Sequence, residues 1–286
     1  MQCVLLHVTS AGNEFMAHIA EVVAWGFRAA GVTCEVVVDG LPPPTPHDDV
    51  LHVVVAPHEY FPLHFLRTRP TIELAPTLAS VAVLNVEQPG SQWFDAACQF
   101  ARQARVVYDI SPAGVTEFER RGVQARHTPL GYVPALEAPA ADRGGRRIDV
   151  LFLGYASPRR TAFFARHAAW FASRNCHVIL TDVGHPRHAQ TPGYRAGPDR
   201  LRLAAEARIV LGVHATERPY FEQHRALLAL ANRALLVTET SEHTAPLEEG
   251  RHFVAAPLDE LPATCERYLG RPAELERIAS EGHTLA

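Results

Sequence analysis

Short apolar runs alternate with helical patterns along the whole chain. Residues 2–8, 34–38 and 50–56 are predicted as buried strands because they are rich in Val, Leu and Ile and are bounded by turn residues. Between the first two runs, the apolar residues repeat at helical spacing from Asn13 to Gly31. Such alternation is typical of parallel sheets covered by helices on both faces. The sequence therefore predicts an α/β fold.

The alternation stops once, in the segment YVPALEAPAADRGGRR at 132–147, which is rich in Pro, Ala, Gly and Arg. It restarts with an apolar run at 149–153. A chain of 286 residues is long enough for two domains. We therefore predict two Rossmann-like, doubly wound domains, 1–137 and 148–286, joined by a linker at 138–147. Ligands of such sheets bind at the carboxyl ends of the strands, so we expect the site in a cleft between the domains.

Composition narrows the classes of function. The chain is 47% hydrophobic and 20% charged, with a net charge of -4, which fits an ordinary globular protein and provides no basic surface for nucleic acid or an anionic membrane. No apolar run approaches the roughly 18 residues of a membrane span. The five cysteines are dispersed, which argues against a disulfide framework or a thiolate metal site. We expect a cytoplasmic protein with no nucleic-acid partner and no membrane span.

The sharpest local signal is LFLGYASPRRTAFF at 151–164. A predicted strand ends at Gly154, Ser157 suits a helix N-cap, and Arg159 and Arg160 fall in the first helical turn. Two cations at the positive end of a helix dipole conflict with it unless an anion shares the site. A phosphate or diphosphate would remove the conflict. The alternatives are that both arginines turn to solvent or pair with a carboxylate from elsewhere in the chain.

Further polar residues follow other predicted strands. After residues 2–8 comes a small-residue turn in which Gly12 and Asn13 could approach a diphosphate or an acceptor, or simply close a tight turn. Glu222 and Arg225, three apart at the start of a helix, either face a ligand or form a surface ion pair. The other candidates after the strands at 209–213 and 235–238 are His214, Glu239, Thr240 and Ser241.

Candidates for acid–base chemistry lie in the first half. His58 follows the strand at 50–56, and Glu87 ends the strand at 81–86. Either could deprotonate an acceptor hydroxyl if the enzyme inverts, and the alternative for each is a capping or surface residue, the commoner role of such residues. His185 and His188 have a spacing that a metal could use, but no third ligand is near, so we expect a solvated loop and no metal.

Six segments follow one another in the order found in one enzyme family: AVLNVEQPGSQWF, VVYDISPAGVTEFERRGV, HTPLGYVPAL, DVLFLGYASPRR, ARIVLGVHATERPYFEQHRALLALANRALLVTETSE and YLGRPAELERIASEGH. Together they cover most of the chain beyond residue 80. In them the chain resembles bacterial glycosyltransferases of the GT-B architecture, of the group-1 type that includes spore-maturation-like glycosyltransferases.

The resemblance implies a transferase of hexosyltransferase type. We expect it to work without a metal or other cofactor, because Arg159, Arg160 and helix N-termini would stabilise the charge that grows on the departing diphosphate. Its donor would be a nucleoside diphosphate sugar bound by the C-terminal domain, and Arg160 matches the basic residue that binds the donor diphosphate. The N-terminal domain would take a small-molecule, glycan or peptide acceptor. Many relatives carry two glutamates where this chain has Tyr220 and Leu228, so retention or inversion of the sugar stays open. The alternatives are a nucleotide-sugar epimerase and a non-catalytic binding protein with the same architecture.

Overall fold

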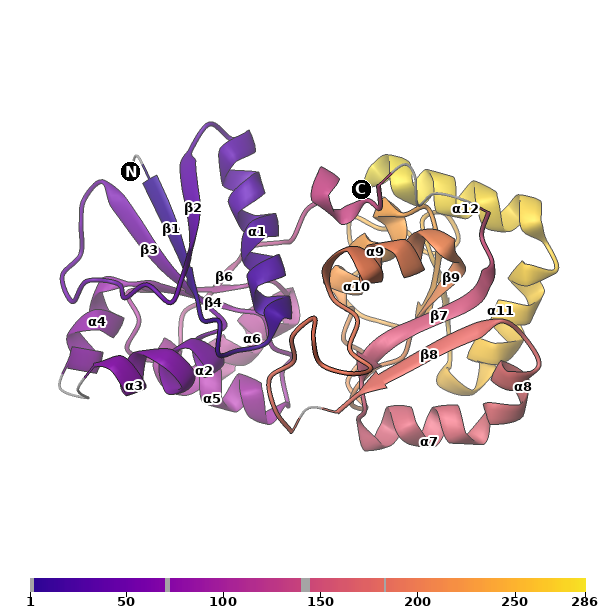
Figure 1. Ribbon diagram of the computed structural model, residues 1–286, viewed down its shortest axis with the longest axis horizontal. Helices are drawn as coiled ribbons and strands as arrows, with labels where there is room; N and C mark the ends of the chain where they lie inside the picture. The colour runs from indigo at the N-terminus through magenta and orange to yellow at the C-terminus, as the bar shows by residue number, and fades with distance from the viewer. Residues whose placement is uncertain (1–2, 70–72, 140–144, 183) are drawn as a thin grey trace. The chain divides into compact units, whose positions relative to one another are not determined.

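Two compact units divide the chain in the computed structural model, which describes residues 3–69, 73–139, 145–182 and 184–286 (Figure 1). The first unit consists of 1–131 with 186–188, and the second of 132–185 with 189–286. The predicted strand residue Gln2 and linker residues 140–144 lie outside the described residues.

Residues 132–137, which the sequence analysis assigned to the first domain, belong to the second unit. The side chain of Asn232 holds this segment in place. Its amide nitrogen donates to the carbonyl of Leu136 at 2.8 Å, and its oxygen accepts from the backbone N–H of Ala138 at 2.8 Å. The break in the apolar pattern therefore lies inside the second unit rather than before it.

The first unit contains a parallel sheet in the order β2-β1-β3-β4-β5-β6. Its strands are β1 (Cys3–Val8), β2 (Thr33–Val38), β3 (Val50–Val55), β4 (Ala82–Asn85), β5 (Val106–Asp109) and β6 (Arg126–His127). The sequence predicted the first four within one or two residues of their ends. The two-residue β6 was missed because it has no apolar run of its own.

Helices follow most of these strands. They are α1 (Glu14–Ala29), α2 (Pro57–Tyr60), the π-helix η1 (Phe61–Phe65), α3 (Leu66–Thr68), α4 (Leu74–Ser80), α5 (Gln92–Ala101) and α6 (Pro112–Arg120). Ser91 and Ser111 cap α5 and α6 by accepting backbone N–H groups, as their residue types predict. The helical run from Pro57 to Thr68 was not predicted, because Pro62 interrupts its pattern.

The second unit has a five-stranded parallel sheet in the order β11-β10-β9-β7-β8. Its strands are β7 (Ile148–Tyr155), β8 (Cys176–Thr181), β9 (Ala207–Gly212), β10 (Leu235–Glu239) and β11 (Val254–Ala256). The short edge strand β11 was missing from the sequence prediction.

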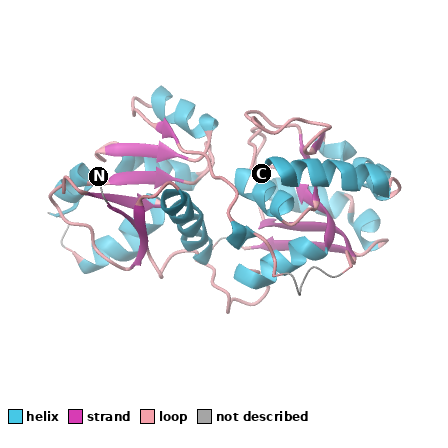
Figure 2. Ribbon diagram, turned by 90° about the horizontal axis from the view of Figure 1, so that it is seen from above, coloured by secondary structure: helices cyan, strands magenta, loops and turns pink. Residues whose placement is uncertain are grey.

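Apolar cores lie on both faces of this sheet. Figure 2 shows helices on both sides of its strands. Val150 and Phe152 pack on one face against α7 and α11, whereas Leu151 and Val210 pack on the other against α9 and α10. The helical elements are η3 (Pro134–Leu136), α7 (Pro158–Arg166), α8 (Ala168–Ala172), α9 (Gly197–Glu206), α10 (Gln223–Ala231), η5 (Leu258–Glu260), α11 (Leu261–Leu269) and α12 (Pro272–Leu285). The helix that begins after the predicted cap Ser157 is followed directly by a second helix, and the two meet at His167.

Within the described ranges, no helix is both long enough and apolar enough to cross a membrane. The α/β prediction with two parallel sheets is confirmed.

Candidate functional site

Arginines and glutamates gather at the carboxyl ends of β7, β9 and β10 in the second unit. We call this group the arginine cluster, and its members are Arg159, Arg160, Glu217, Glu222, Arg225 and Glu239. All except Glu217 are site candidates of the sequence analysis. The structure joins them in two adjacent groups of ion pairs, Arg159 with Glu217 and Glu239, and Glu222 with Arg160 and Arg225.

Helix α7 positions the first two arginines. The hydroxyl of Ser157 accepts the backbone N–H of Arg160 at 3.2 Å, which fixes the N-terminus of the helix as predicted. The guanidinium of Arg159 then donates two hydrogen bonds to the carboxylate of Glu239, at 2.6 and 2.7 Å. Its Nε atom lies 3.1 Å from a carboxylate oxygen of Glu217. Of the alternatives for Arg159, the structure shows pairing with carboxylates from elsewhere in the chain. These carboxylates already balance its charge at the helix N-terminus, so the helix dipole by itself is no evidence for a bound phosphate.

Arg160 is the most buried member of the cluster, with 1% of its surface exposed. Its Nε donates to the carbonyl of Val213 at 2.8 Å, and its Nη2 donates to the carboxylate of Glu222. The same carboxylate accepts two hydrogen bonds from Arg225, at 2.8 and 2.6 Å. Glu222 thus bridges two buried guanidinium groups. The interpretation of Glu222 and Arg225 as a surface ion pair is wrong.

Aromatic and glycine residues make room for this network. Both guanidinium groups lie over the ring of Phe152, with Arg160 at 5.4 Å and Arg225 at 4.8 Å from its centroid. A Cβ atom at Gly154 would lie 2.8 Å from the Phe152 ring and 3.1 Å from Arg160. Gly154 therefore gives space to the buried arginine.

His214 lies beside the cluster in one defined tautomer. Ser241 donates its hydroxyl proton to the carbonyl of Glu239 at 2.8 Å, so it must accept the bond that joins it to His214 Nε2 at 2.8 Å. Burial lowers the pKa of His214, against the opposing charges of Glu239 and Glu222. The imidazole is therefore neutral with its proton on Nε2. The exposed Thr240 contributes its backbone N–H to β11, through a bond to the carbonyl of Ala256.

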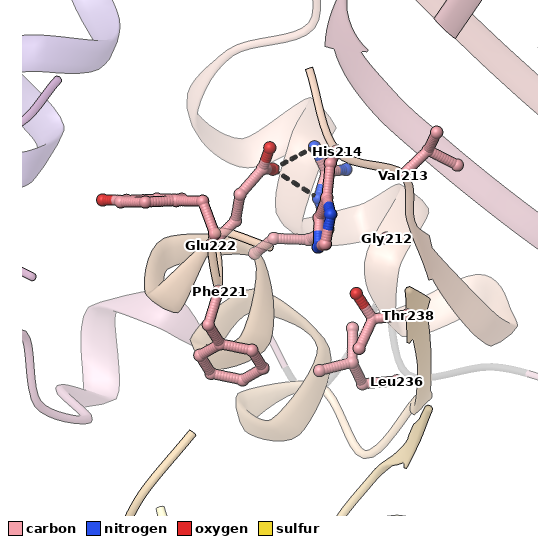
Figure 3. Close-up of a pocket in the computed structure, with 9 residues that line it drawn as sticks. Gly212, Val213, His214, Phe221, Glu222, Leu236 and Thr238 are labelled. Atoms are coloured by element: carbon pink, nitrogen blue, oxygen red, sulfur yellow. Dashed lines mark hydrogen bonds and ion pairs between the residues drawn. The ribbon is translucent and has the colours of Figure 1, made fainter. Parts of the chain in front are cut away.

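A small pocket opens next to the network (Figure 3). It is lined by Gly212, Val213, His214, Tyr220, Phe221, Glu222, Arg225, Leu236 and Thr238. Of these, Phe221 and Thr238 carry no sequence signal beyond being apolar or strand-forming. Tyr220 faces the pocket, whereas Leu228 is 4% exposed and belongs to the apolar core. The two positions where relatives carry glutamates therefore have different environments here.

A second polar group lies at the carboxyl ends of β3, β4 and β5 in the first unit. We call it the carboxyl cluster, and its members are His58, Glu59, Asn85, Glu87 and Asp109. The backbone of Ala56 turns from β3 into α2 with a positive φ of 53°, which places His58 and Glu59 there. Asn85 and Asp109 are register partners in neighbouring strands. The sequence analysis named His58 and Glu87 as candidates, whereas Asn85 and Asp109 were not predicted.

Gly12 and Asn13 contact this cluster directly. The backbone N–H of Asn13 donates to Glu59 at 2.8 Å, and its side-chain amide donates to the other carboxylate oxygen. A Cβ atom at Gly12 would lie 2.3 Å from Glu59 Oε2, so only glycine fits this approach. The carbonyl oxygen of the Asn13 side chain accepts the backbone N–H of Arg187 at 2.9 Å. In the structure, these two residues hold Glu59.

His58 and Glu87 form a close pair. His58 Nε2 lies 3.4 Å from a carboxylate oxygen of Glu87 and 3.9 Å from one of Glu59. Burial lowers the pKa of His58 to about 4. Burial, together with the charges of Glu59 and Asp109, raises the pKa of Glu87 to about 8. At neutral pH both side chains are uncharged, with the titratable proton on Glu87.

Asp109 is fully buried, and burial raises its pKa to about 7. Hydrogen bonds from the amide of Asn85 and the backbone N–H of Ser111, both at 2.7 Å, oppose this shift. A Cβ atom at Gly114 would lie 2.1 Å from the Asp109 carboxyl group, so the first turn of α6 also requires glycine. Asp109 is thus held in place by two hydrogen bonds and by the close packing of α6.

Metal ligation finds no support in the part of the chain that the structure describes, where no three or more His, Cys, Asp or Glu side chains are placed to share an ion. His185 and His188 lie in the loop between β8 and α9.

Solved structures with the same fold were found at low sequence identity. HepE from Anabaena in complex with UDP-glucose has a TM-score of 0.61 and 12% identity, with 100% of this chain and 94% of that chain covered. TarM from S. aureus, in complex with UDP among other ligands, has a TM-score of 0.54 and 8% identity, with 85% of this chain and 52% of that chain covered. These likenesses show the GT-B fold and confirm that prediction.

An alpha-glucosyltransferase in complex with UDP and a 13-mer DNA containing an HMU base is also similar, with a TM-score of 0.59 and 9% identity over 99% of this chain and 94% of that one. This fold is thus compatible with a nucleic-acid ligand, and the expectation that this chain has none rests on its charge alone. No protein-family model matches the chain, and no curated protein matches it by sequence.

Proposed function

We propose that this protein is a glycosyltransferase that moves a sugar from a nucleoside diphosphate sugar to an acceptor nucleophile. The fold supports this function, since similar structures are glycosyltransferases solved with UDP or UDP-glucose. The observation that carries it in this chain is the arginine cluster at the carboxyl ends of the second sheet, where doubly wound folds bind ligands.

Arg159 is the arginine that can reach a donor. Its side chain is 15% exposed, against 2% for Arg160. One of its two carboxylate partners, Glu217, is 87% exposed and therefore exchanges readily with other anions. A diphosphate offers paired oxygens to a guanidinium in the same way as a carboxylate. In our proposal the donor diphosphate replaces Glu217 on Arg159, while Arg160, Glu222 and Arg225 hold the surrounding backbone.

This arrangement supplies the chemistry that the leaving group needs. Negative charge grows on the diphosphate as the sugar departs, and a preoriented guanidinium at a helix N-terminus stabilises that charge without requiring a metal ion. The first unit would take the acceptor, with Glu87 and His58 as the acid–base pair. Because Glu87 holds its proton up to about pH 8, its role as a base strengthens with rising pH.

Nucleotide binding tests the donor site. Arg159→Ala should weaken binding of UDP and UDP-glucose by about 10- to 100-fold, the equivalent of about 1.5–3 kcal/mol for a charge-assisted contact. Arg166→Ala is the matched control because Arg166 lies on the same helix with a 63% exposed side chain that pairs with Asp259. Titration calorimetry below the melting temperature of each variant gives the dissociation constants.

Glu217→Gln sharpens the test. It removes the carboxylate that competes for Arg159, so UDP affinity should stay level or rise by up to about fivefold, the range of an exposed ion pair. Equal affinity of wild type, Arg159→Ala and Arg166→Ala would remove Arg159 from the donor site. A loss of affinity in Glu217→Gln would show that Glu217 helps binding and would contradict the exchange.

A further inference from the structure

Three polar groups in the carboxyl cluster have acceptor atoms that receive no hydrogen bond. The side-chain oxygen of Asn85 is buried without a partner, and so are both ring nitrogens of His58, one of which is an acceptor in the neutral imidazole. The carboxyl group of Glu87 receives no hydrogen bond from the described chain either, and the one ion-pair approach to it there is that of His58 Nε2 at 3.4 Å. Buried acceptors without donors are costly, which points to a ligand that supplies donors.

The cluster also lacks positive charge. Among the described residues, no arginine forms an ion pair with Glu59, Glu87 or Asp109, although every basic side chain apart from histidine in this protein is an arginine. The one cationic influence on Glu59 is His188. Glu59 and Glu87 therefore lie beside the buried His58, and the charge of Asp109 acts on Glu87, with no arginine of the described chain to balance them.

We propose that the carboxyl cluster is a subsite for a primary ammonium group of the acceptor, held by Glu87, Asn85 Oδ1 and His58. The inference rests on the proposed function, because it takes the bound group to belong to the acceptor substrate. The acceptor class is then an amine-bearing molecule.

The number and type of donors favour an ammonium group. It carries three N–H donors and no acceptor, which matches three side chains that each present an unpaired acceptor. A hydroxyl group brings a single donor and leaves two of these acceptors unsatisfied. The 18% exposed side chain of Glu87 provides access from solvent to a cluster in which His58 and Asp109 are almost completely buried.

Binding of the ammonium is coupled to the proton on Glu87. The cation stabilises the ionised carboxylate, so it must displace the proton that Glu87 holds below about pH 8. The other titratable groups that face Glu87 are His58 and Glu59 from α2 and Asp109 from β5, and His188 faces Glu59. His58 is already neutral above pH 6.5, so affinity for an amine rises between pH 6.5 and 8.

The test compares 2-aminoethanol with 1,2-ethanediol, which differ in an ammonium group in place of a hydroxyl. Aliphatic amines stay cationic across this pH range. Titrations are followed by the backbone amide shifts of Asn85, Glu87 and Asp109 in isotopically labelled full-length protein. The amine should bind about tenfold or more tightly than the diol at pH 8. Glu87→Gln should abolish this preference, whereas Glu35→Gln, which removes an exposed carboxylate of the same unit on β2, should preserve it.

Equal affinity for amine and diol, no shift with either, or an unchanged preference in Glu87→Gln would overturn the proposal. If Glu87→Gln does not fold, the wild-type profile decides, because an affinity for 2-aminoethanol that is flat from pH 6.5 to 8 contradicts the coupling. UDP is titrated in parallel. Loss of UDP binding with a retained amine preference refutes the donor site alone, and the reverse result refutes the ammonium subsite alone.

Discussion

The arginine cluster and the carboxyl cluster occupy the same place in two similar sheets and handle buried charge in opposite ways. In the second unit, Glu222 and Glu239 each pair with arginine at hydrogen-bond distance. In the first unit, Glu87 and Asp109 have no arginine partner among the described residues, and burial raises the pKa of both. One cluster is neutralised by internal ion pairs and the other by bound protons. The first is therefore suited to exchange one anion for another, and the second to exchange a proton for a cation.

The largest expected effect comes from making the same substitution in both clusters. Glu222→Gln leaves Arg160 and Arg225 buried without their shared carboxylate, so it should destabilise the second unit by about 3–5 kcal/mol. Glu87→Gln replaces a carboxyl group that at neutral pH is protonated in the folded state and ionised in the unfolded state, so it should not destabilise the first unit and should stabilise it there by about 1–3 kcal/mol. Urea denaturation of the two variants measures both values.

Glu217→Gln is the control for the first value, because it removes an exposed partner of Arg159 and should cost less than about 1 kcal/mol. Similar losses in Glu222→Gln and Glu87→Gln would erase the contrast between the clusters. The result for Glu222→Gln also decides whether this variant can be used in binding experiments. A variant that is partly unfolded would show weaker donor binding whether or not Glu222 contacts the donor.

The sequence predicted the elements that carry both clusters better than the contacts within them. Ser157 as the cap and Arg159 and Arg160 in the first turn of α7 followed from local rules. Their partners Glu222 and Glu239 are 62 and 80 residues away in the chain, and no local pattern specifies such pairs. The choice between phosphate, solvent and carboxylate therefore needed the structure.

In the carboxyl cluster too, local sequence patterns predicted the backbone turn but not the contacts between distant residues. The turn at Gly12 and Asn13 was predicted, but its purpose was not, because Glu59 reaches it from 46 residues further along the chain. Asp109 gave no signal because it ends an ordinary strand just before the cap Ser111. Only its burial and its bond to Asn85 distinguish it from a surface aspartate.

A moderate effect is expected from pH. A carboxyl group whose folded-state pKa is raised contributes stability below its unfolded pKa and loses it as pH rises through the folded value. For Glu87 this range runs from 4.5 to about 8, and Asp109 acts in the same direction from 3.8 to about 7. His7 and His58, with pKa values lowered from 6.5 to about 4, act in the opposite direction, but only below about pH 6.5.

Between pH 6.5 and 8 the wild type should therefore lose about 1–2 kcal/mol of stability relative to Glu87→Gln. The measurement is the difference in the free energy of unfolding between the two proteins at several pH values. A constant difference across this window would mean that Glu87 titrates as an ordinary surface carboxylate, and the proton-based account of the first cluster would be wrong.

The smallest expected effect is the response of the melting temperature to divalent metal ions. It tests whether the carboxyl cluster binds an ammonium group or a divalent metal. Hard divalent ions need several oxygen ligands. Both oxygens of Glu59 accept hydrogen bonds from Asn13, and those of Asp109 accept from Asn85 and Ser111, which leaves Glu87 as the one carboxyl group of the cluster that accepts none. Adding Mg²⁺ or Mn²⁺ should accordingly leave the melting temperature unchanged, and turnover and UDP affinity should survive EDTA. If these ions raise the melting temperature of the wild type but not that of Glu87→Gln, the carboxyl cluster binds a metal. If EDTA abolishes turnover and a divalent ion restores it, charge stabilisation by Arg159 without a metal is wrong.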